Sequence, residues 1–145
     1  LDRAKYASAE GVHKGAYVLA DAPNGKPSVI LIGTGTELSL AVEAYEQLTA
    51  AGIAARVVSL PSTELFEHYC QHHPEYREQV FPASVTARVS IEMGSTFGWD
   101  RYIGSRGIAI GMTTFGASAP LKDVMAHFGI SSAAVVTAAK RLLGQ

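Results

Sequence analysis

Hydrophobic and polar positions follow two different periods along this chain, which predicts strands and helices in turn. A bare apolar run, Val29 to Ile32, passes into a Gly/Thr turn at residues 33–36. Such a run without alternation is typical of a parallel strand covered on both faces. Apolar residues then recur at helical spacing from Leu38 to Leu48, and Gly52 stands where a glycine commonly ends a helix. The pattern predicts a strand, a tight turn and a helix with Thr36 as its N-cap.

The rest of the chain continues this alternation. Turn-forming residues from Asp21 to Pro27 predict a hairpin between the first two strands, which leaves the first as an antiparallel edge. We therefore expect an α/β fold: a three-layer, doubly wound, five-stranded mixed sheet, mostly parallel with one antiparallel edge strand. Besides the strand and helix described above, the pattern predicts strands at 16–20, 54–60, 85–92 and 108–111, and helices at 63–66, 74–80, 98–102, 121–128 and from Ser131 or Ser132 to Leu142.

Length, composition and charge limit the domain count and the classes of partner. The 145 residues are 48% hydrophobic and 17% charged, enough for one domain with a sizeable core. We place a connector from a preceding domain at 1–14 and the domain itself at 15–145. A net charge of -1 without a Lys/Arg cluster argues against nucleic acid and anionic membranes as partners. The lack of long apolar runs and the single cysteine, Cys70, fit a cytoplasmic protein.

The turn formed by Gly33, Thr34, Gly35 and Thr36 is a candidate anion site. Backbone N–H groups at a helix N-terminus can bind a phosphate, and such turns hold ligands in many open α/β sheets. The alternative is a purely structural turn, since the motif lacks the full Gly-x-Gly-x-x-Gly fingerprint and the lysine of a P-loop. Glu37 also places a carboxylate at the positive end of the helix. Both interpretations stay open on the sequence.

A cluster of His68, Cys70, His72 and His73 invites comparison with a metal site. His68 and His72 would share one helix face, but Cys70 would point about 200° away from His68 at the 3.6-residue period. The spacing also matches none of the usual zinc patterns. We therefore expect a solvated segment and no metal.

Other charged residues are candidates for catalysis or binding. Glu92, near the end of a predicted strand, can serve as a general base, although a structural hydrogen bond or an interface contact suits an isolated carboxylate better. Arginines can bind phosphate, but these are interpreted as separate surface charges: Arg56, Arg88, Arg101 and Arg106.

Four aromatic residues fall on loops after the predicted strands. Aromatic side chains at such positions are enriched at protein contacts. We expect these residues to be exposed and some of them to form an interface with another domain or subunit, while the alternative, that they cover the domain's own core, stays open: Phe97, Trp99, Tyr102 and Phe115.

Almost the whole chain resembles the C-terminal domain of transketolase, because short motifs of that family occur here in the same order. They are Gly-Ala-Tyr-Val-Leu (15–19), Ile-Gly-Thr-Gly-Thr-Glu (32–37), Ala-Arg-Val-Val-Ser-Leu-Pro-Ser (55–62), Thr-Ala-Arg-Val (86–89), Glu-Met-Gly (92–94), Thr-Phe-Gly-Ala-Ser-Ala-Pro (114–120) and Ala-Lys-Arg-Leu-Leu (139–143). Bacterial relatives usually have Ala-Thr-Gly-Ser-Glu at 33–37 and Glu-Ala-Gly at 92–94, which are mild departures.

The resemblance implies part of an enzyme that transfers a two-carbon ketol unit between sugar phosphates in the pentose phosphate pathway. In that family, two preceding domains hold thiamine diphosphate and a divalent metal, magnesium or calcium, at the interface of a homodimer. The C-terminal domain binds no cofactor and carries no catalytic residue there, so the isolated chain is expected to be inactive and to serve assembly. The alternatives are the C-terminal domain of a related thiamine diphosphate enzyme and a stand-alone module that binds small anions or another protein.

Overall fold

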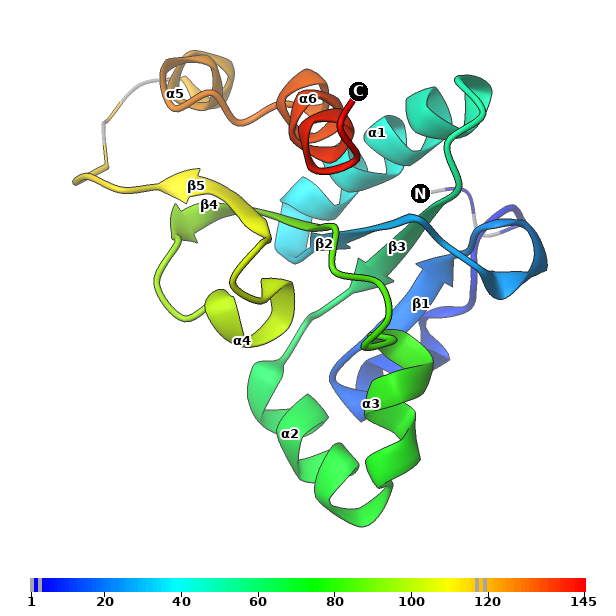
Figure 1. Cartoon of the computed structure of the whole chain (residues 1–145). Coiled ribbons are helices and arrows are strands. Elements are labelled where there is room, and N and C mark those ends of the chain that lie inside the picture. Colours follow the sequence, from blue (N-terminus) through cyan, green and yellow to red (C-terminus); the bar gives the residue numbers. More distant parts are fainter. Residues whose placement is uncertain (1, 3, 117, 119) are drawn as a thin grey trace.

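The computed structural model describes residue 2, residues 4–116, residue 118 and residues 120–145, which form an α/β fold (Figure 1). Its strands are β1 (Tyr17–Ala20), β2 (Val29–Gly33), β3 (Ala55–Ser59), β4 (Arg88–Ser95) and β5 (Ile108–Met112). Its helices are α1 (Leu38–Ala50), α2 (Thr63–His72), α3 (Pro74–Val80), α4 (Asp100–Ile103), α5 (Leu121–His127) and α6 (Ser132–Leu142). Short 3-10 helices cover Ala9–Lys14, Pro23–Gly25 and Gly35–Glu37.

The strands form one five-stranded mixed sheet in the order β1-β3-β2-β4-β5. β3, β2, β4 and β5 are parallel, and β1 pairs antiparallel with β3 at the edge. The expected fold class is therefore confirmed. The apolar run of β2 occupies the centre, where all five of its residues are buried. A strand covered on both faces by helices is the environment that such a run requires.

The predicted hairpin between the first two strands is wrong. β1 pairs with β3, with Tyr17 opposite Ser59 and Val18 opposite Val58, while both edges of β2 are taken by β3 and β4. The turn after β1 is fastened to β3 as well, because the Arg56 guanidinium donates to both carboxylate oxygens of Asp21 at 2.8 and 2.9 Å. These long-range contacts outweigh the local turn preference.

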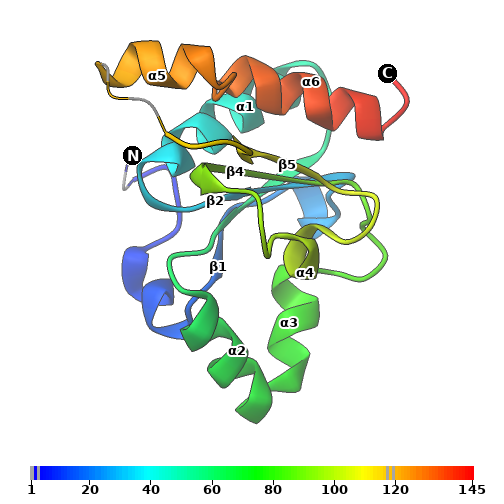
Figure 2. The ribbon, with the colours of Figure 1, turned by 90° about the vertical axis from the view of Figure 1, so that its left-hand side faces the viewer.

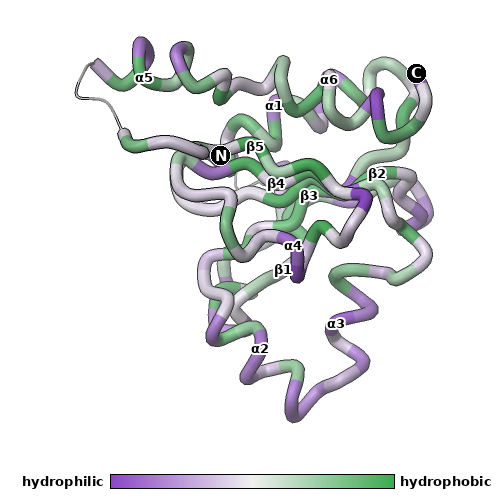
Figure 3. The backbone as a smooth tube through the Cα atoms, turned by 60° about the vertical axis from the view of Figure 1, so that its left-hand side comes forward, coloured by the Kyte–Doolittle hydropathy of each residue, from purple (hydrophilic) through white to green (hydrophobic). Residues whose placement is uncertain are grey.

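The sheet separates two hydrophobic cores, and helices cover both faces (Figures 1 and 2). α1 and α6 pack on one face, where Leu31 and Val57 meet Leu48. α2, α3 and α4 lie on the other face, where Ile32 meets Phe66. Figure 3 shows the hydrophobic character concentrated in the central strands, whereas α2 and α3 carry many hydrophilic residues. Among the described helices, none combines the length and apolar character needed to cross a membrane.

Helix ends follow the predicted capping signals in part. Gly52, with φ of 78°, follows α1 as expected, and Ser131 Oγ accepts a hydrogen bond from the Ala134 amide at the start of α6. The predicted N-cap role of Thr36 is wrong, because residues 35–37 form a 3-10 turn and α1 begins only at Leu38. The Thr36 hydroxyl instead donates to the Glu37 carboxylate at 3.0 Å.

The first residues of the chain contact the domain that follows. The Tyr6 hydroxyl donates to Glu46 of α1 at 2.6 Å, and the Lys5 ammonium binds the same carboxylate. The Ala7 amide donates to the Leu19 carbonyl of β1 at 3.0 Å. Residues 5–7 of the expected connector at 1–14 are thus held against α1 and β1, and the role of this connector as a link to a preceding domain stays a proposal.

Candidate functional site

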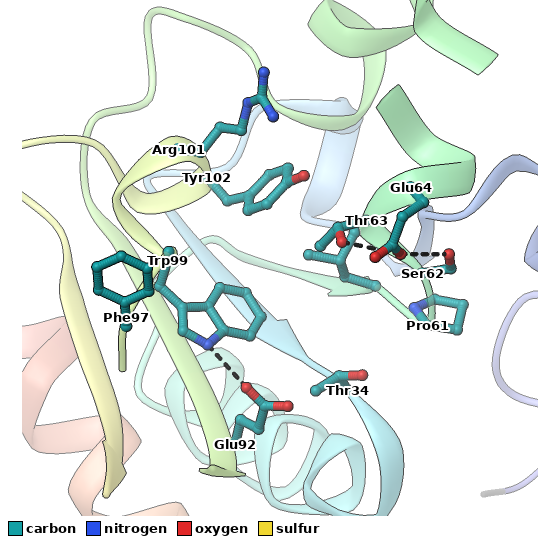
Figure 4. Close-up of a pocket in the computed structure, with 12 residues that line it drawn as sticks. Thr34, Pro61, Ser62, Thr63, Glu64, Glu92, Phe97, Trp99, Arg101 and Tyr102 are labelled. Carbon is teal, nitrogen blue, oxygen red and sulfur yellow. Dashed lines mark hydrogen bonds between the residues drawn. The ribbon is translucent and has the colours of Figure 1, made fainter. Parts of the chain in front are cut away.

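A pocket of about 380 Å³ lies outside the carboxyl ends of the central strands (Figure 4). The chain runs from β2 through α1 to β3 on one side of β2, whereas β4 lies on its other side. Ligands in open α/β sheets bind at such a topological switch point. The pocket is lined by Thr34 after β2 and by residues 60–64 after β3. Its other lining residues come from β4, from the loop after it and from α4: Glu92, Phe97, Gly98, Trp99, Arg101 and Tyr102.

Glu92 and Trp99 form one wall of this pocket. The indole Nε1–H donates to Glu92 Oε2 at 3.0 Å, and only 8% of Trp99 is exposed. The bond joins β4 to the first turn of α4 and fixes the orientation of both side chains. The structural hydrogen bond that we expected for Glu92 is therefore confirmed. A general base would need a substrate proton within reach, and the indole already occupies one oxygen.

Glu64 stands on the opposite wall, in the first turn of α2. The hydroxyls of Ser62 and Thr63 both donate to Glu64 Oε2 at 3.2 Å, and Ser62 Oγ caps the helix by accepting from the Leu65 amide. Its own backbone N–H, followed by these hydroxyls, lowers the pKa of Glu64. The positive end of α2 is thus already matched by a carboxylate.

Behind the pocket, Glu67 joins three helices. Arg77 of α3 donates to Glu67 Oε2 at 2.6 Å, and the Tyr102 hydroxyl of α4 donates to Oε1 at 2.9 Å. Arg101 lies 3.6 Å from the same carboxylate. Burial opposes the charged form, but the hydrogen bonds from Arg77 and Tyr102 lower the pKa of Glu67. Burial and the bond to Glu67 raise the pKa of Tyr102.

Sequence reasoning missed the role of Glu67, because its partners lie 10 and 35 residues away. Only the packing of α2 against α3 and α4 brings these side chains together. Glu67 lies one residue beyond the helix predicted at 63–66, so the sequence pattern did not place it on a helix face.

The candidate anion site at residues 33–36 lies above β2, and only Thr34 of its four residues lines the pocket. Glu37 is 7% exposed, and its Oε2 lies 3.6 Å from the position that a Cβ on Gly35 would take. A carboxylate beside the turn repels a phosphate, which weighs against anion binding. The proposed site stays a prediction that no described contact tests.

The four aromatic residues separate into two pairs. Phe97 is 94% and Phe115 is 99% exposed, as expected, and both line a second, wider groove of about 1090 Å³ beside β5. The expected exposure of Trp99 and Tyr102 is wrong, because they are 8% and 3% exposed. Trp99, just before α4, and Tyr102 within it belong to the core of that face together with Phe66, which is the alternative that the sequence left open.

The arginines also divide into two kinds. Arg101 and Arg106 are surface residues, as expected. The same expectation is wrong for Arg56, which is 5% exposed and, besides Asp21, binds the carbonyls of Gln79 and Val80. It is also wrong for Arg88, whose guanidinium donates to four backbone carbonyls of residues 81, 82, 85 and 102. Burial lowers the pKa of Arg88.

The His/Cys segment belongs to α2, which continues well beyond the predicted helix. His68 and His72 have ring centroids 5.0 Å apart on one face. Cys70 is 8% exposed and packs in the core, so the fully solvated segment that we expected is wrong for this residue. Burial raises the pKa of its thiol. Within the described ranges, no three His, Cys, Asp or Glu residues form a group suited to a metal ion.

Comparisons with known proteins give one consistent result. The family model of the transketolase-like TK C-terminal domain matches residues 15–131. The chain is 56% identical over 137 residues to a chloroplastic transketolase of Craterostigma plantagineum, an alignment that covers 94% of this chain and 26% of that protein. A transketolase of Geobacillus stearothermophilus is 46% identical over 136 residues, covering 94% and 20%.

Solved structures agree with these relatives. Transketolase from Leishmania mexicana superposes with a TM-score of 0.83 at 38% identity, covering 94% of this chain and 19% of that chain. A Pichia stipitis transketolase in complex with sedoheptulose-7-phosphate gives a TM-score of 0.82 at 34% identity, covering 97% and 19%. The chain thus spans 19–26% of the length of these four proteins.

Proposed function

Because this chain belongs to the family of transketolase-like C-terminal domains, we propose that it is the last domain of a longer transketolase. That protein transfers a two-carbon ketol unit between sugar phosphates in the pentose phosphate pathway. The observation that carries the proposal is the match of the family model to residues 15–131. Residues 15–145 form the domain in this proposal, and 1–14 connect it to the preceding one.

The domain itself contributes no catalytic side chain in this proposal. Glu92 and Glu67, two of the best-placed carboxylates, are engaged by Trp99, and by Arg77 and Tyr102. Such bonds hold side chains in fixed positions and suit a structural role. Its contribution is to assembly with the preceding domains and with the second subunit of a homodimer.

The described residues do not fit thiamine diphosphate. Three helix N-termini beside the pocket, those of η3 (Gly35–Glu37), α2 and α4, carry their own carboxylate, Glu37, Glu64 and Asp100. A diphosphate would be repelled at each of these positions. We therefore assign thiamine diphosphate, with magnesium or calcium, to the parts of the longer protein outside this chain, and derive no catalytic step here.

Phe97 and Phe115 form the proposed contact surface. They are almost fully exposed and line one groove with Ile103 and Met112. Exposed apolar side chains that share a groove mark protein contacts, because their burial removes apolar area from water. We propose that this surface packs against the rest of the longer protein.

The location of the protein is proposed to be the cytoplasm. Relatives named as chloroplastic make a plastid the alternative compartment. A fluorescent fusion of the complete protein, imaged in its own cells, separates the two locations.

The test of the function is a coupled ketol-transfer assay with thiamine diphosphate and magnesium. It is run on this 145-residue chain and on the complete protein that contains it. We expect activity only in the complete protein and its loss when thiamine diphosphate is omitted. Inactivity of a folded complete protein would contradict the proposal, and activity of the short chain would contradict the absence of catalytic residues.

A further inference from the structure

Glu37 is a buried charge without a counter-ion in the described part of the chain. It is 7% exposed and ends η3, where the chain passes from β2 into α1. Its one hydrogen bond to a described residue comes from the Thr36 hydroxyl, which donates to Oε1 at 3.0 Å. No ion pair among the described residues includes it. By contrast Arg56, which is buried to the same degree, is paired with Asp21. Buried carboxylates are rarely left without a partner.

The helix that begins beside Glu37 matches this charge only in part. The aligned peptide dipoles of an α-helix act as about half a unit of positive charge at its N-terminus. Glu37 directly precedes α1, so it receives this stabilisation. About half a unit of negative charge is then left without a match at a site that is largely removed from water. A cation from outside the described residues would complete the site.

The second carboxylate oxygen of Glu37 faces open space beside Gly35. A Cβ built on Gly35 would meet Glu37 Oε2 at 3.6 Å and, its chain neighbours apart, no other atom within 4 Å. Oε2 also reaches the surface, because Ser90 Oγ is the one fully buried side-chain N or O atom without a hydrogen bond in the described chain. Gly35 has no side chain in the way, so a hydrogen-bond donor can approach Oε2 over this residue.

We propose that Oε2 of Glu37 binds an arginine or lysine side chain from the part of the longer protein outside this chain. Charge complementarity favours this partner, because a carboxylate oxygen with no donor accepts a strong, charge-assisted hydrogen bond. One free oxygen is too few ligands for a metal ion such as calcium. The inference rests on the proposal that this chain is one domain of a longer protein, and it names a contact through which that domain assembles.

Hydrogen exchange of the backbone amides around Glu37 tests the pairing. The first amides of a helix have no acceptor within the helix, so they exchange rapidly unless another group covers them. Mass spectrometry measures the exchange of residues 34–40 in the 145-residue chain and in the complete protein that contains it. We expect exchange to be at least about tenfold slower in the complete protein, where the basic side chain holds Glu37 and covers this turn.

Two variants and their controls identify the group responsible for this protection. Each variant is made in both proteins, and the ratio of its two exchange rates is compared with that of the parent. Glu37→Gln keeps the side-chain shape but removes the charge, so most of the tenfold ratio should be lost, whereas Glu43→Gln, at an exposed site of α1, should keep it. Gly35→Ala places a methyl group in the approach to Oε2 and should also lower the ratio. Gly52→Ala has a positive φ as well but no neighbour within 4 Å, and it should not.

Two results would overturn the proposal. They are equal exchange of the parent in the two proteins, and extra protection that survives in Glu37→Gln. The exchange ratio does not depend on ketol transfer, so the two proposals fail separately. An inactive complete protein that keeps the protection would contradict the proposed function alone, and an active one without it would contradict the pairing of Glu37 alone.

Discussion

Two arginine side chains hold several segments of this fold together through hydrogen bonds. The hydrophobic pattern of the sequence does not reveal these contacts. Arg56, the second residue of β3, is buried, and its guanidinium donates to Asp21, to the Gly25 carbonyl and to two backbone carbonyls of α3. Arg88 binds four carbonyls at the start of β4. Because a planar guanidinium offers five donors, one residue can hold several loop ends at once.

Replacing Arg56 should therefore destabilise the domain. Arg56→Met leaves Asp21 and several carbonyls without their donors, and we expect the free energy of unfolding to fall by about 3 kcal/mol. Urea denaturation followed by circular dichroism measures the change. Arg106→Met, at an exposed site, is the control and should stay within about 0.5 kcal/mol of the parent. Equal effects of the two substitutions would contradict this role of Arg56.

Glu67 should make stability depend on pH. The pKa of Glu67 is lower in the folded chain than its ordinary value of 4.5, so its carboxylate stabilises the fold fully above that value. This contribution is lost as the pH falls through the folded pKa. Glu67→Gln should cost about 1–2 kcal/mol at pH 7 and progressively less in acid.

Denaturation curves at pH 7 and at more acidic pH measure this difference. The parent should lose more stability on acidification than Glu67→Gln does, whereas Glu43→Gln should follow the parent. Parallel pH profiles for the parent and Glu67→Gln would show that the Glu67 carboxylate does not carry the effect.

At the scale of elements, Gly15, which precedes β1, packs closely against the backbone at the start of α2. A Cβ on Gly15 would lie 2.1 Å from the Phe66 amide nitrogen and 2.5 Å from the Ser62 carbonyl oxygen. Gly15 and Gly52 share a φ of 78°, but a Cβ on Gly52 would meet nothing within 4 Å. Comparing alanine substitutions at the two glycines therefore separates the energetic cost of the left-handed backbone conformation from the cost of a packing clash.

Alanine at these two positions should give different results. Gly52→Ala should cost about 1 kcal/mol, since only the left-handed conformation is penalised. Gly15→Ala should cost at least about 2 kcal/mol more, because the backbone of α2 must also move. Thermal and urea unfolding of both variants measure the difference. A Gly15→Ala variant as stable as Gly52→Ala would show that the backbone of α2 can move away from Gly15 at little cost in free energy.

Most elements were predictable from the sequence, and the errors lie where contacts are long-range. The apolar run of β2 and the helical spacing of α1 leave little choice of secondary structure. The length of α2 was underestimated, because the polar histidines near its end interrupt the apolar pattern. Phe66 and Cys70 are nevertheless buried on one face of this helix. The partner of β1 was missed, because strand pairing depends on which edges of the sheet are already occupied.

The candidate site was predictable only in its location. The Gly/Thr turn after β2 indicated the carboxyl edge of the sheet, and Thr34 does line the pocket there. The other wall comes from residues after β3 and around α4, which no local motif connects with the turn. Trp99 and Tyr102 were predicted at a surface, but they form the inner side of the pocket.

At the scale of the whole molecule, exposed Phe97 and Phe115 predict a contact with the rest of the longer protein. In the isolated chain, Phe97→Ser and Phe115→Ser should change stability by no more than about 0.5 kcal/mol, since neither ring is buried. In the complete protein the double variant should weaken assembly about tenfold or more. Sedimentation and the ketol-transfer assay measure the two effects.

A control tests whether any exposed apolar residue would behave in this way. Leu121→Ser, on α5, removes a side chain that is 56% exposed but lies outside the groove, and it should leave assembly unchanged. Unchanged assembly in the Phe97/Phe115 double variant would show that the groove faces solvent in the complete protein.

The sequence by itself determined the class of this fold, because the period of its apolar residues dictates which segments are strands, which are helices and which faces are buried. Its motifs also pointed to the family that the comparisons establish. Only the tertiary structure decided that β1 pairs with β3, that Arg56 and Glu67 take part in hydrogen-bond networks, and that residues after β2 and β3 and around α4 line one pocket. These features join residues far apart in the chain, and their positions follow from the packing of whole elements.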